Sequence, residues 1–133
     1  MSTVEVVEGV HSENSLKLIQ KGELKALGDN LQKKIQDALA RSFQKGSDLR
    51  IKYSFTSAVP SGLELAPGAF MRLVEFGLDV TFSDSLGKEL SKIHLYDYDT
   101  PGQGGSYQKT VDDVFERFAH AIAKYAKDNF KGN

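Results

Sequence analysis

The segment whose spacing comes closest to a chemical motif runs from Thr100 to Thr110, TPGQGGSYQKT, where three glycines precede a lysine and a threonine. A Walker-type phosphate loop requires GxxxxGK[ST], because its lysine directly follows the last glycine and reaches the terminal phosphates. Here Gln108 precedes Lys109, and Gly105 lies four positions before that lysine. The dinucleotide spacing GxGxxG is also missing. We therefore interpret the segment as a linker and not as a nucleotide site.

The other candidates for catalysis or metal binding have simpler structural explanations. The chain contains no cysteine, so it has neither a thiol nucleophile nor a thiolate metal site. The three histidines have no spacing typical of metal ligands: His11, His94 and His120. Two pairs of carboxylates fit a strand end and a helix start, namely Asp97 with Asp99 and Asp112 with Asp113. We expect a protein that is not an enzyme and that holds no cofactor and no metal.

Charge and length exclude further classes of function. The chain has 17 basic and 18 acidic residues and a formal net charge of −1, which argues against a nucleic-acid partner. No apolar run approaches the roughly 18 residues that cross a bilayer. The 133 residues suffice for one domain, 1–133, whose first part, 1–22, we expect to be a strand and a loop.

Hydrophobic periodicity predicts the elements that position these residues. Alternation of apolar and polar side chains predicts strands at 3–10, 49–57, 74–82 and 89–98, with Asp84 and Gly87 in a hairpin turn. Apolar residues at three- and four-residue steps predict helices from Glu23 to near Lys45 and over 110–130, the second capped by Thr110. The order β-α-β-β-β-α predicts an α+β two-layer sandwich, a mostly antiparallel sheet of about four strands with two helices on one face.

A row of polar and aromatic residues falls on the sheet face that the helices leave open. The alternation places His94, Tyr96 and Tyr98 on this outer face, and Arg50 and Lys52 face the same way from another strand. Aromatic rings beside cations bind sugars, peptides or a protein partner. The tyrosines could equally shield the strand backbone from solvent, and both interpretations remain open.

The segment 57–73, SAVPSGLELAPGAFMRL, interrupts the patterned strands with a long link. It holds two prolines and two glycines, yet also Leu63, Leu65 and Phe70. Long links in compact domains are usually functional or disordered. An apolar link outside the core would form an adhesive patch for another envelope protein or a second copy. The alternative is that it folds down over a sheet edge.

The order and spacing of these segments resembles a domain-of-unknown-function family of Gram-negative bacterial envelope lipoproteins. The similar features are the strand at 49–57, the excursion with proline and glycine, a strand ending in Asp84, a turn with Gly87 and Lys88, and Gly104-Gly105 before a helix rich in Ala and aromatic residues. The resemblance covers 24–130, most closely 49–125, and the lipid-bearing cysteine of the family is absent. It implies a membrane-tethered module facing the periplasm, with no catalytic residues to carry over.

The first residues, Met-Ser-Thr-Val, are compatible with such a tether. With cysteine in place of Met1 they resemble the start of a mature lipoprotein; alternatively, Met1 is the native start. We expect a non-catalytic domain on the periplasmic side of the envelope, lipid-anchored through a cysteine outside this chain, that binds a protein or scaffolds. The alternatives are a glycan- or peptide-binding module that uses Tyr96 and Tyr98, and a cytoplasmic location.

Overall fold

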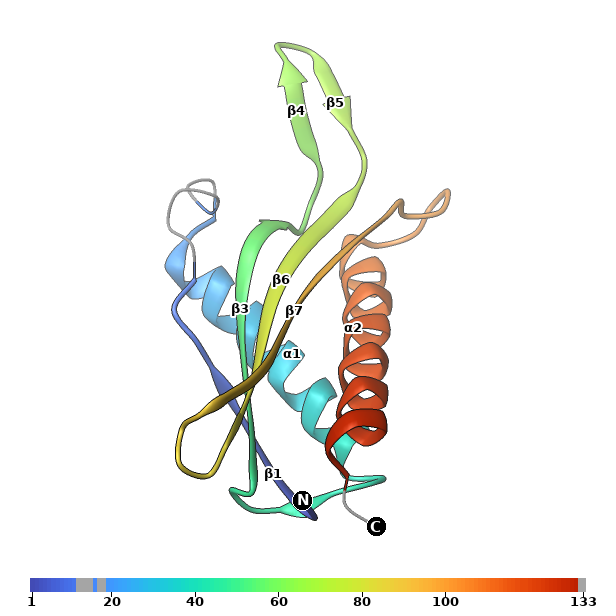
Figure 1. Cartoon of the computed structure of the whole chain (residues 1–133). Helices are drawn as coiled ribbons and strands as arrows, with labels where there is room; N and C mark the ends of the chain where they lie inside the picture. Colours follow the sequence, from blue (N-terminus) through green and yellow to red (C-terminus); the bar gives the residue numbers. More distant parts are fainter. Residues whose placement is uncertain (12–15, 17–18, 132–133) are drawn as a thin grey trace.

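The computed structural model describes residues 1–11, 16 and 19–131, so part of the polar loop expected after the first strand lies outside the described residues. Seven strands and two helices follow one another in these residues (Figure 1). They are β1 (Thr3–Glu8), α1 (Lys21–Leu39), β2 (Gln44–Lys45), β3 (Leu49–Val59), β4 (Leu63–Ala66), β5 (Ala69–Met71), β6 (Val74–Asp84), β7 (Glu89–Asp99) and α2 (Tyr107–Phe130).

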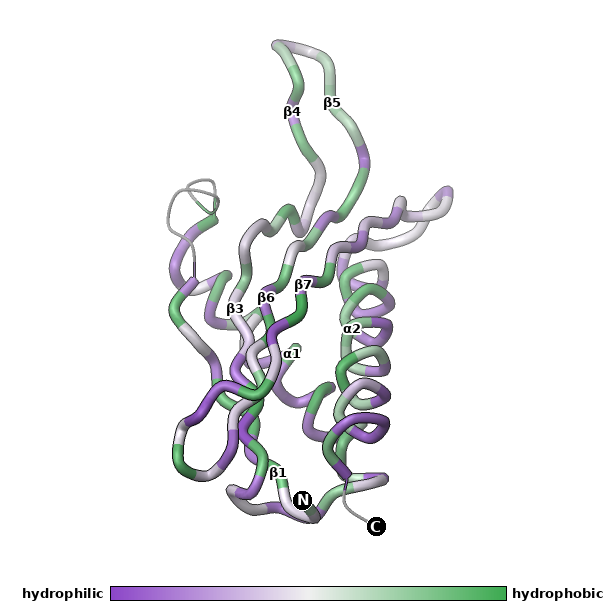
Figure 2. Tube along the Cα trace, in the orientation of Figure 1, coloured by the Kyte–Doolittle hydropathy of each residue, from purple (hydrophilic) through white to green (hydrophobic). Residues whose placement is uncertain are grey.

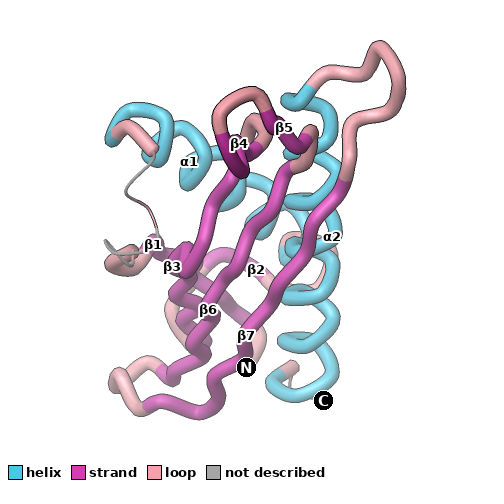
Figure 3. Tube along the Cα trace, turned by 90° about the horizontal axis from the view of Figure 1, so that it is seen from above, coloured by secondary structure: helices cyan, strands magenta, loops and turns pink. Residues whose placement is uncertain are grey.

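Five strands form one sheet in the order β2-β1-β3-β6-β7, and both helices cover the same face (Figure 3). β1 pairs in parallel with β2 and β3, whereas β3, β6 and β7 are antiparallel. The predicted two-layer α+β sandwich is therefore confirmed. β4 and β5 form a separate two-stranded hairpin.

Strand alternation builds the core between sheet and helices. The apolar positions of β3 and β6 are fully buried: Leu49, Ile51, Tyr53, Phe55, Val74, Phe76, Leu78, Val80 and Phe82. Phe115 of α2 stacks on Phe55 and meets Phe76 edge-on, with ring centroids 5.9 and 4.8 Å apart. The second helix thus packs on the apolar face of the sheet, as the predicted two-layer sandwich requires.

The hairpin turn between β6 and β7 forms as expected. The Asp84 carboxylate accepts the backbone N–H groups of Leu86 and Lys88 at 2.9 Å, and Gly87 has a φ of +85°. An aspartate that binds nearby backbone donors and a glycine with positive φ are typical of tight turns.

Each helix in the structure differs from its predicted range at one end. The first ends at Leu39 and not near Lys45, because Phe43 turns into the core and Gln44–Lys45 pairs with β1 as β2. The second begins at Tyr107, since the Ser106 hydroxyl accepts the N–H of Lys109 at 3.2 Å and so caps the helix in place of the expected Thr110.

Neither helix combines the length and the apolar composition that a membrane crossing would need, among the residues described.

Candidate functional site

The β4–β5 hairpin projects beyond the sheet and the helices (Figure 1), and hydrophobic residues lie along both of its strands (Figure 2). The predicted long link is thus an ordered hairpin that does not fold over a sheet edge. Pro67 followed by Gly68 with a φ of +80° fits a type II turn at its tip. Leu65 is 60% exposed, Phe70 59% and Met71 43%, whereas Leu63 is half-buried.

Contacts at its base hold the hairpin to the body. The N–H of Gly62 donates to the carbonyl of Leu73 at 2.9 Å. The Arg72 guanidinium lies 5.6 Å from the centre of the Tyr107 ring and donates to the carbonyl of Gly105 at 3.3 Å. These contacts connect the hairpin to the start of α2, so its apolar side chains are presented by a fixed base.

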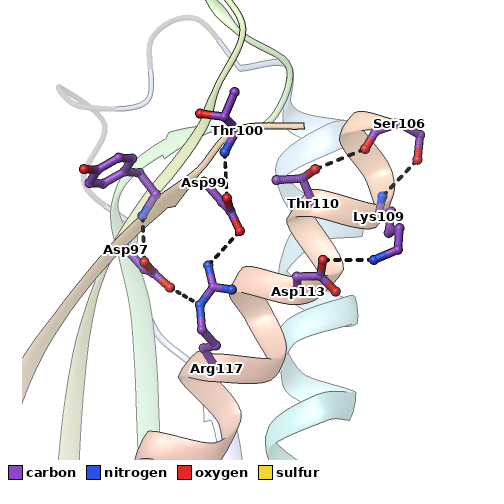
Figure 4. Close-up of polar contacts among 9 residues, drawn as sticks. Asp97, Asp99, Thr100, Ser106, Lys109, Thr110, Asp113 and Arg117 are labelled. Atoms are coloured by element: carbon purple, nitrogen blue, oxygen red, sulfur yellow. Dashed lines mark hydrogen bonds and ion pairs between the residues drawn. The ribbon is translucent and has the colours of Figure 1, made fainter. Parts of the chain in front are cut away.

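The glycine-bearing linker 100–106 leads into α2, whose cap by Ser106 is drawn in Figure 4, and internal hydrogen bonds take up backbone donors that a phosphate cradle would need. The N–H of Gly105 donates to the carbonyl of Gly102 at 2.7 Å, and the cap by Ser106 occupies a donor at the start of α2. Below the linker, Arg117 donates to the carboxylates of Asp97 at 2.6 Å and Asp99 at 3.2 Å. This carboxylate pair therefore anchors α2 to β7.

The outer sheet face carries the three predicted residues of β7. Tyr96 and Tyr98 are each more than half exposed, with ring centroids 6.3 Å apart, and His94 Nδ1 lies 2.9 Å from the Asp79 carboxylate. Partial desolvation and the neighbouring Glu75 carboxylate raise the pKa of Tyr96.

Arg50 and Lys52 lie on the same outer face of the sheet, but far from the two tyrosines. Lys52 lies opposite Thr81 of β6, whereas Tyr98 lies opposite Glu75. That separation of six residues is about 20 Å at roughly 3.3 Å per residue. Arg50 lies further still and pairs with Glu5 at 3.5 Å. The cations and the tyrosines do not form one site.

Sequence reasoning missed the role of a partly buried imidazole, His11, three residues after the end of β1. The N–H of Phe55 donates to His11 Nδ1 at 2.9 Å, and His11 Nε2 faces the Glu8 carboxylate. Since a nitrogen that accepts a hydrogen bond carries no proton, the ring donates to Glu8 through Nε2. His11 thereby satisfies a donor of β3 where β1 has ended, a role that no spacing in the sequence indicates.

A cavity of about 650 Å³ lies between β1, β2 and the end of α1, which was also not predicted. Val4, Val6 and Phe43 supply apolar wall, and Asp37 and Lys45 are among its polar residues. Its size is that of a small-molecule pocket. No group of three or more potential metal-ligating side chains occurs in the described ranges.

Solved structures of other proteins share the fold of this chain. No model of a protein family matches the chain, and no curated protein matches it. A candidate lipoprotein from Caulobacter crescentus CB15 is similar in structure, with a TM-score of 0.52 and 19% identity over 95% of this chain and 85% of that chain. A minor lipoprotein from Acinetobacter baumannii has a TM-score of 0.55 and 10% identity over 93% and 94%. The predicted resemblance is therefore confirmed at the level of the fold, which this chain shares with lipoproteins of Gram-negative bacteria.

Proposed function

We propose that this chain is the folded domain of a lipid-anchored envelope protein and that it binds another protein through the β4–β5 hairpin. The role is non-catalytic, on the periplasmic side of the envelope. The fold shared with two lipoproteins supports the anchoring. The hairpin supports the binding.

The observation that carries the proposal is the exposure of apolar side chains on a projecting element. Leu65, Phe70 and Met71 are each exposed on this one hairpin, and the buried core contains none of them. Exposed apolar groups that cluster mark interaction sites, because burying them against a partner is favourable by about 25 cal/mol per Å².

In this proposal, anchoring and protein binding belong to opposite ends of the molecule. Residue 1 and the C-terminal end of α2 lie at one end, and the hairpin projects from the other (Figure 1). An anchor attached before residue 1 would leave the hairpin pointing away from the membrane. The surface available to a partner is then the hairpin with the nearby Tyr98.

A photo-crosslinking amino acid at position 65 tests the binding. In the cells that make this protein, we expect it to yield one discrete adduct, and the double substitution Leu65→Ser, Phe70→Ser to reduce adduct formation from position 71 at least about tenfold. Leu86 supplies the matched control, because it is 92% exposed at the tip of the other hairpin. Crosslinker at position 86 should give no adduct, and Leu86→Ser should leave the position-71 adduct unchanged.

Two results would contradict the proposal: equal adducts from positions 65 and 86, or an unfolded double variant by circular dichroism. The second result would mean that these side chains stabilise the fold and are not free to bind.

A small-ligand function remains the second candidate, favoured by the closely spaced rings of Tyr96 and Tyr98. It predicts that a glycan or peptide shifts the ring resonances of these tyrosines. The distance of Arg50 and Lys52 confines such a site to the tyrosine end of the face.

A further inference from the structure

The outer edge of β7 is the long open edge of the sheet. Among the described residues, the eleven residues of β7 pair only with β6, and the opposite edge strand, β2, has two residues. An edge strand presents unpaired N–H and C=O groups, which natural proteins commonly block with proline, bulges or very short strands. From Ser91 to Asp99, β7 has no proline, and its pairing with β6 contains no register shift.

The register identifies which backbone groups point outward. The N–H of Tyr98 donates to the Asp97 carboxylate at 2.9 Å instead of to β6. In an antiparallel ladder, residues that exchange hydrogen bonds with the neighbour alternate with residues that do not. Lys92, His94 and Tyr96 have the parity of Tyr98, so their N–H and C=O groups also point away from β6. In the described part of the chain, no loop or side chain accepts from these three N–H groups.

Helix α2 runs alongside this edge (Figures 1 and 3). Arg117 binds Asp97 near one end of β7, and the Tyr125 hydroxyl lies 2.5 Å from Ser91 Oγ near the other. Ala121 lies midway on the same helix face, because side chains four residues apart are neighbours on a helix. Ala121 is exposed, so no strand covers the helix at that point.

The side of β7 that faces α2 is also incompletely covered. Ile93 and Leu95 point to the helix layer but remain only partly buried. One further strand beside β7 would cover both side chains together with Ala121. On the outer face, the same strand would lie beside Lys92 and Tyr96, both of which are exposed.

We propose that this edge accepts an extended segment of another protein as a sixth strand lying over α2. Backbone hydrogen bonds to Lys92, His94 and Tyr96 hold the segment. Its apolar side chains face Ile93 and Leu95, and an acidic side chain faces outward beside Lys92. The site is separate from the β4–β5 hairpin and does not depend on it.

A second copy of this chain fits the edge less well. Pairing of β7 with itself about a two-fold axis would place the two strands about 4.8 Å apart. It would also bring two copies of α2 together along the same edge, where packed helices need about 8–10 Å between axes. A lone extended segment has no helix of its own to accommodate.

A synthetic peptide of residues 74–84 is a suitable probe, because β7 already pairs with this sequence on its other side. Amide hydrogen exchange of the full chain gives the readout. We expect the amides of Lys92, His94 and Tyr96 to exchange rapidly in the free chain, and those of Ile93 and Leu95 slowly. Saturating peptide should slow the first three at least about tenfold, since their N–H groups become hydrogen-bonded.

Matched controls distinguish backbone pairing of the peptide with β7 from non-specific binding of its apolar side chains. The same peptide with methyl groups on alternate backbone nitrogens keeps its side chains but loses the donors of one edge, and it should not protect these amides. Ala121→Glu should weaken peptide binding about tenfold, because a charge then lies beneath the added strand. His120→Glu adds the same charge at an exposed position of α2 and should leave binding unchanged.

Three outcomes would overturn the inference. The first is slow exchange of all five amides in the dilute free chain, which would mean that the chain closes its own edge. The second is absence of protection at peptide concentrations up to about 1 mM. The third is protection that appears without peptide as the chain dimerises, which would make a second copy the occupant. The Leu65→Ser, Phe70→Ser variant should bind the peptide normally, so failure here is distinct from failure of the hairpin proposal.

Discussion

Tyr53 shows how one polar atom is accommodated in an otherwise apolar core. Its side chain is fully buried, and its hydroxyl donates to the carbonyl of Gly28 in α1 at 2.7 Å. A Cβ at position 28 would overlap the Glu8 carboxylate, so glycine leaves room there for β1. A glycine inside a helical pattern indicates close packing, but the group that approaches Gly28 could be found only from the fold.

Burial, with the nearby carboxylates of Glu8 and Asp29, raises the pKa of Tyr53 well above its ordinary value of 10. A group whose pKa is raised on folding stabilises the folded state fully below its unfolded pKa and loses that contribution as pH rises beyond it. Above about pH 10 the unfolded chain ionises while the folded chain keeps the proton. The free energy of unfolding should then fall by up to about 1.4 kcal/mol per pH unit from this residue.

Tyr53→Phe tests this expectation by urea unfolding. Near pH 8 the variant should be less stable by about 1 kcal/mol, since one hydrogen bond is lost. Between about pH 10 and 11 this difference should shrink or reverse, because phenylalanine has no proton to lose. The exposed Tyr98→Phe serves as the control for removal of a hydroxyl. A difference that stays constant with pH would contradict the assignment.

At the scale of elements, periodicity in the sequence predicted the long strands and their buried faces. It did not predict the features that depend on how strands pair, namely the short strand β2 and the strand register. Strict alternation in β3, β6 and β7 identified the strands and their buried faces. The hairpin residues LELAPGAFM have no such alternation, although Pro67-Gly68 indicated a turn. β2 has two residues and exists because Phe43 enters the core and redirects the chain to β1. The separation of Lys52 from Tyr98 depends on strand register, which one sequence does not specify.

The hairpin should be removable without loss of the fold. Gly62 and Leu73 are already hydrogen-bonded, so an Asn-Gly turn joining them can replace 63–72. The deleted strands contribute nothing to the buried core, and we expect the melting temperature to change by no more than about 5 °C. Thermal unfolding followed by circular dichroism measures this shift. Phe76→Ala is the contrasting variant, with an expected cost of about 3–5 kcal/mol for a core cavity. Unfolding of the shortened chain would mean that the hairpin supports the sheet.

At the scale of the whole molecule, the buried core and the surfaces proposed for binding lie on different elements. β3 and β6 lie in the interior of the sheet and carry the largest buried side chains, whereas the hairpin and the outer edge of β7 carry the exposed ones. The resemblance to envelope lipoproteins could be predicted from the order of the elements. The separation of the core from the exposed hairpin could not be predicted, because it depends on the end of the sheet at which each connection lies.

A terminal deletion comparable in length to the hairpin excision tests this division. Residues 1–9 contain β1, whose Val4 and Val6 are buried and pair beside Leu49 and Ile51 of β3. Losing two buried valines removes about 3–6 kcal/mol, a large share of the roughly 5–15 kcal/mol that stabilises a domain. The deletion also turns β3 into an open edge, which favours aggregation. We expect the chain without 1–9 to be largely unfolded or aggregated in conditions where the chain without the hairpin is a folded monomer, as measured by thermal unfolding and sedimentation. If both deletions are tolerated equally, the parallel strand is dispensable and the stable unit is the antiparallel sheet with its helices.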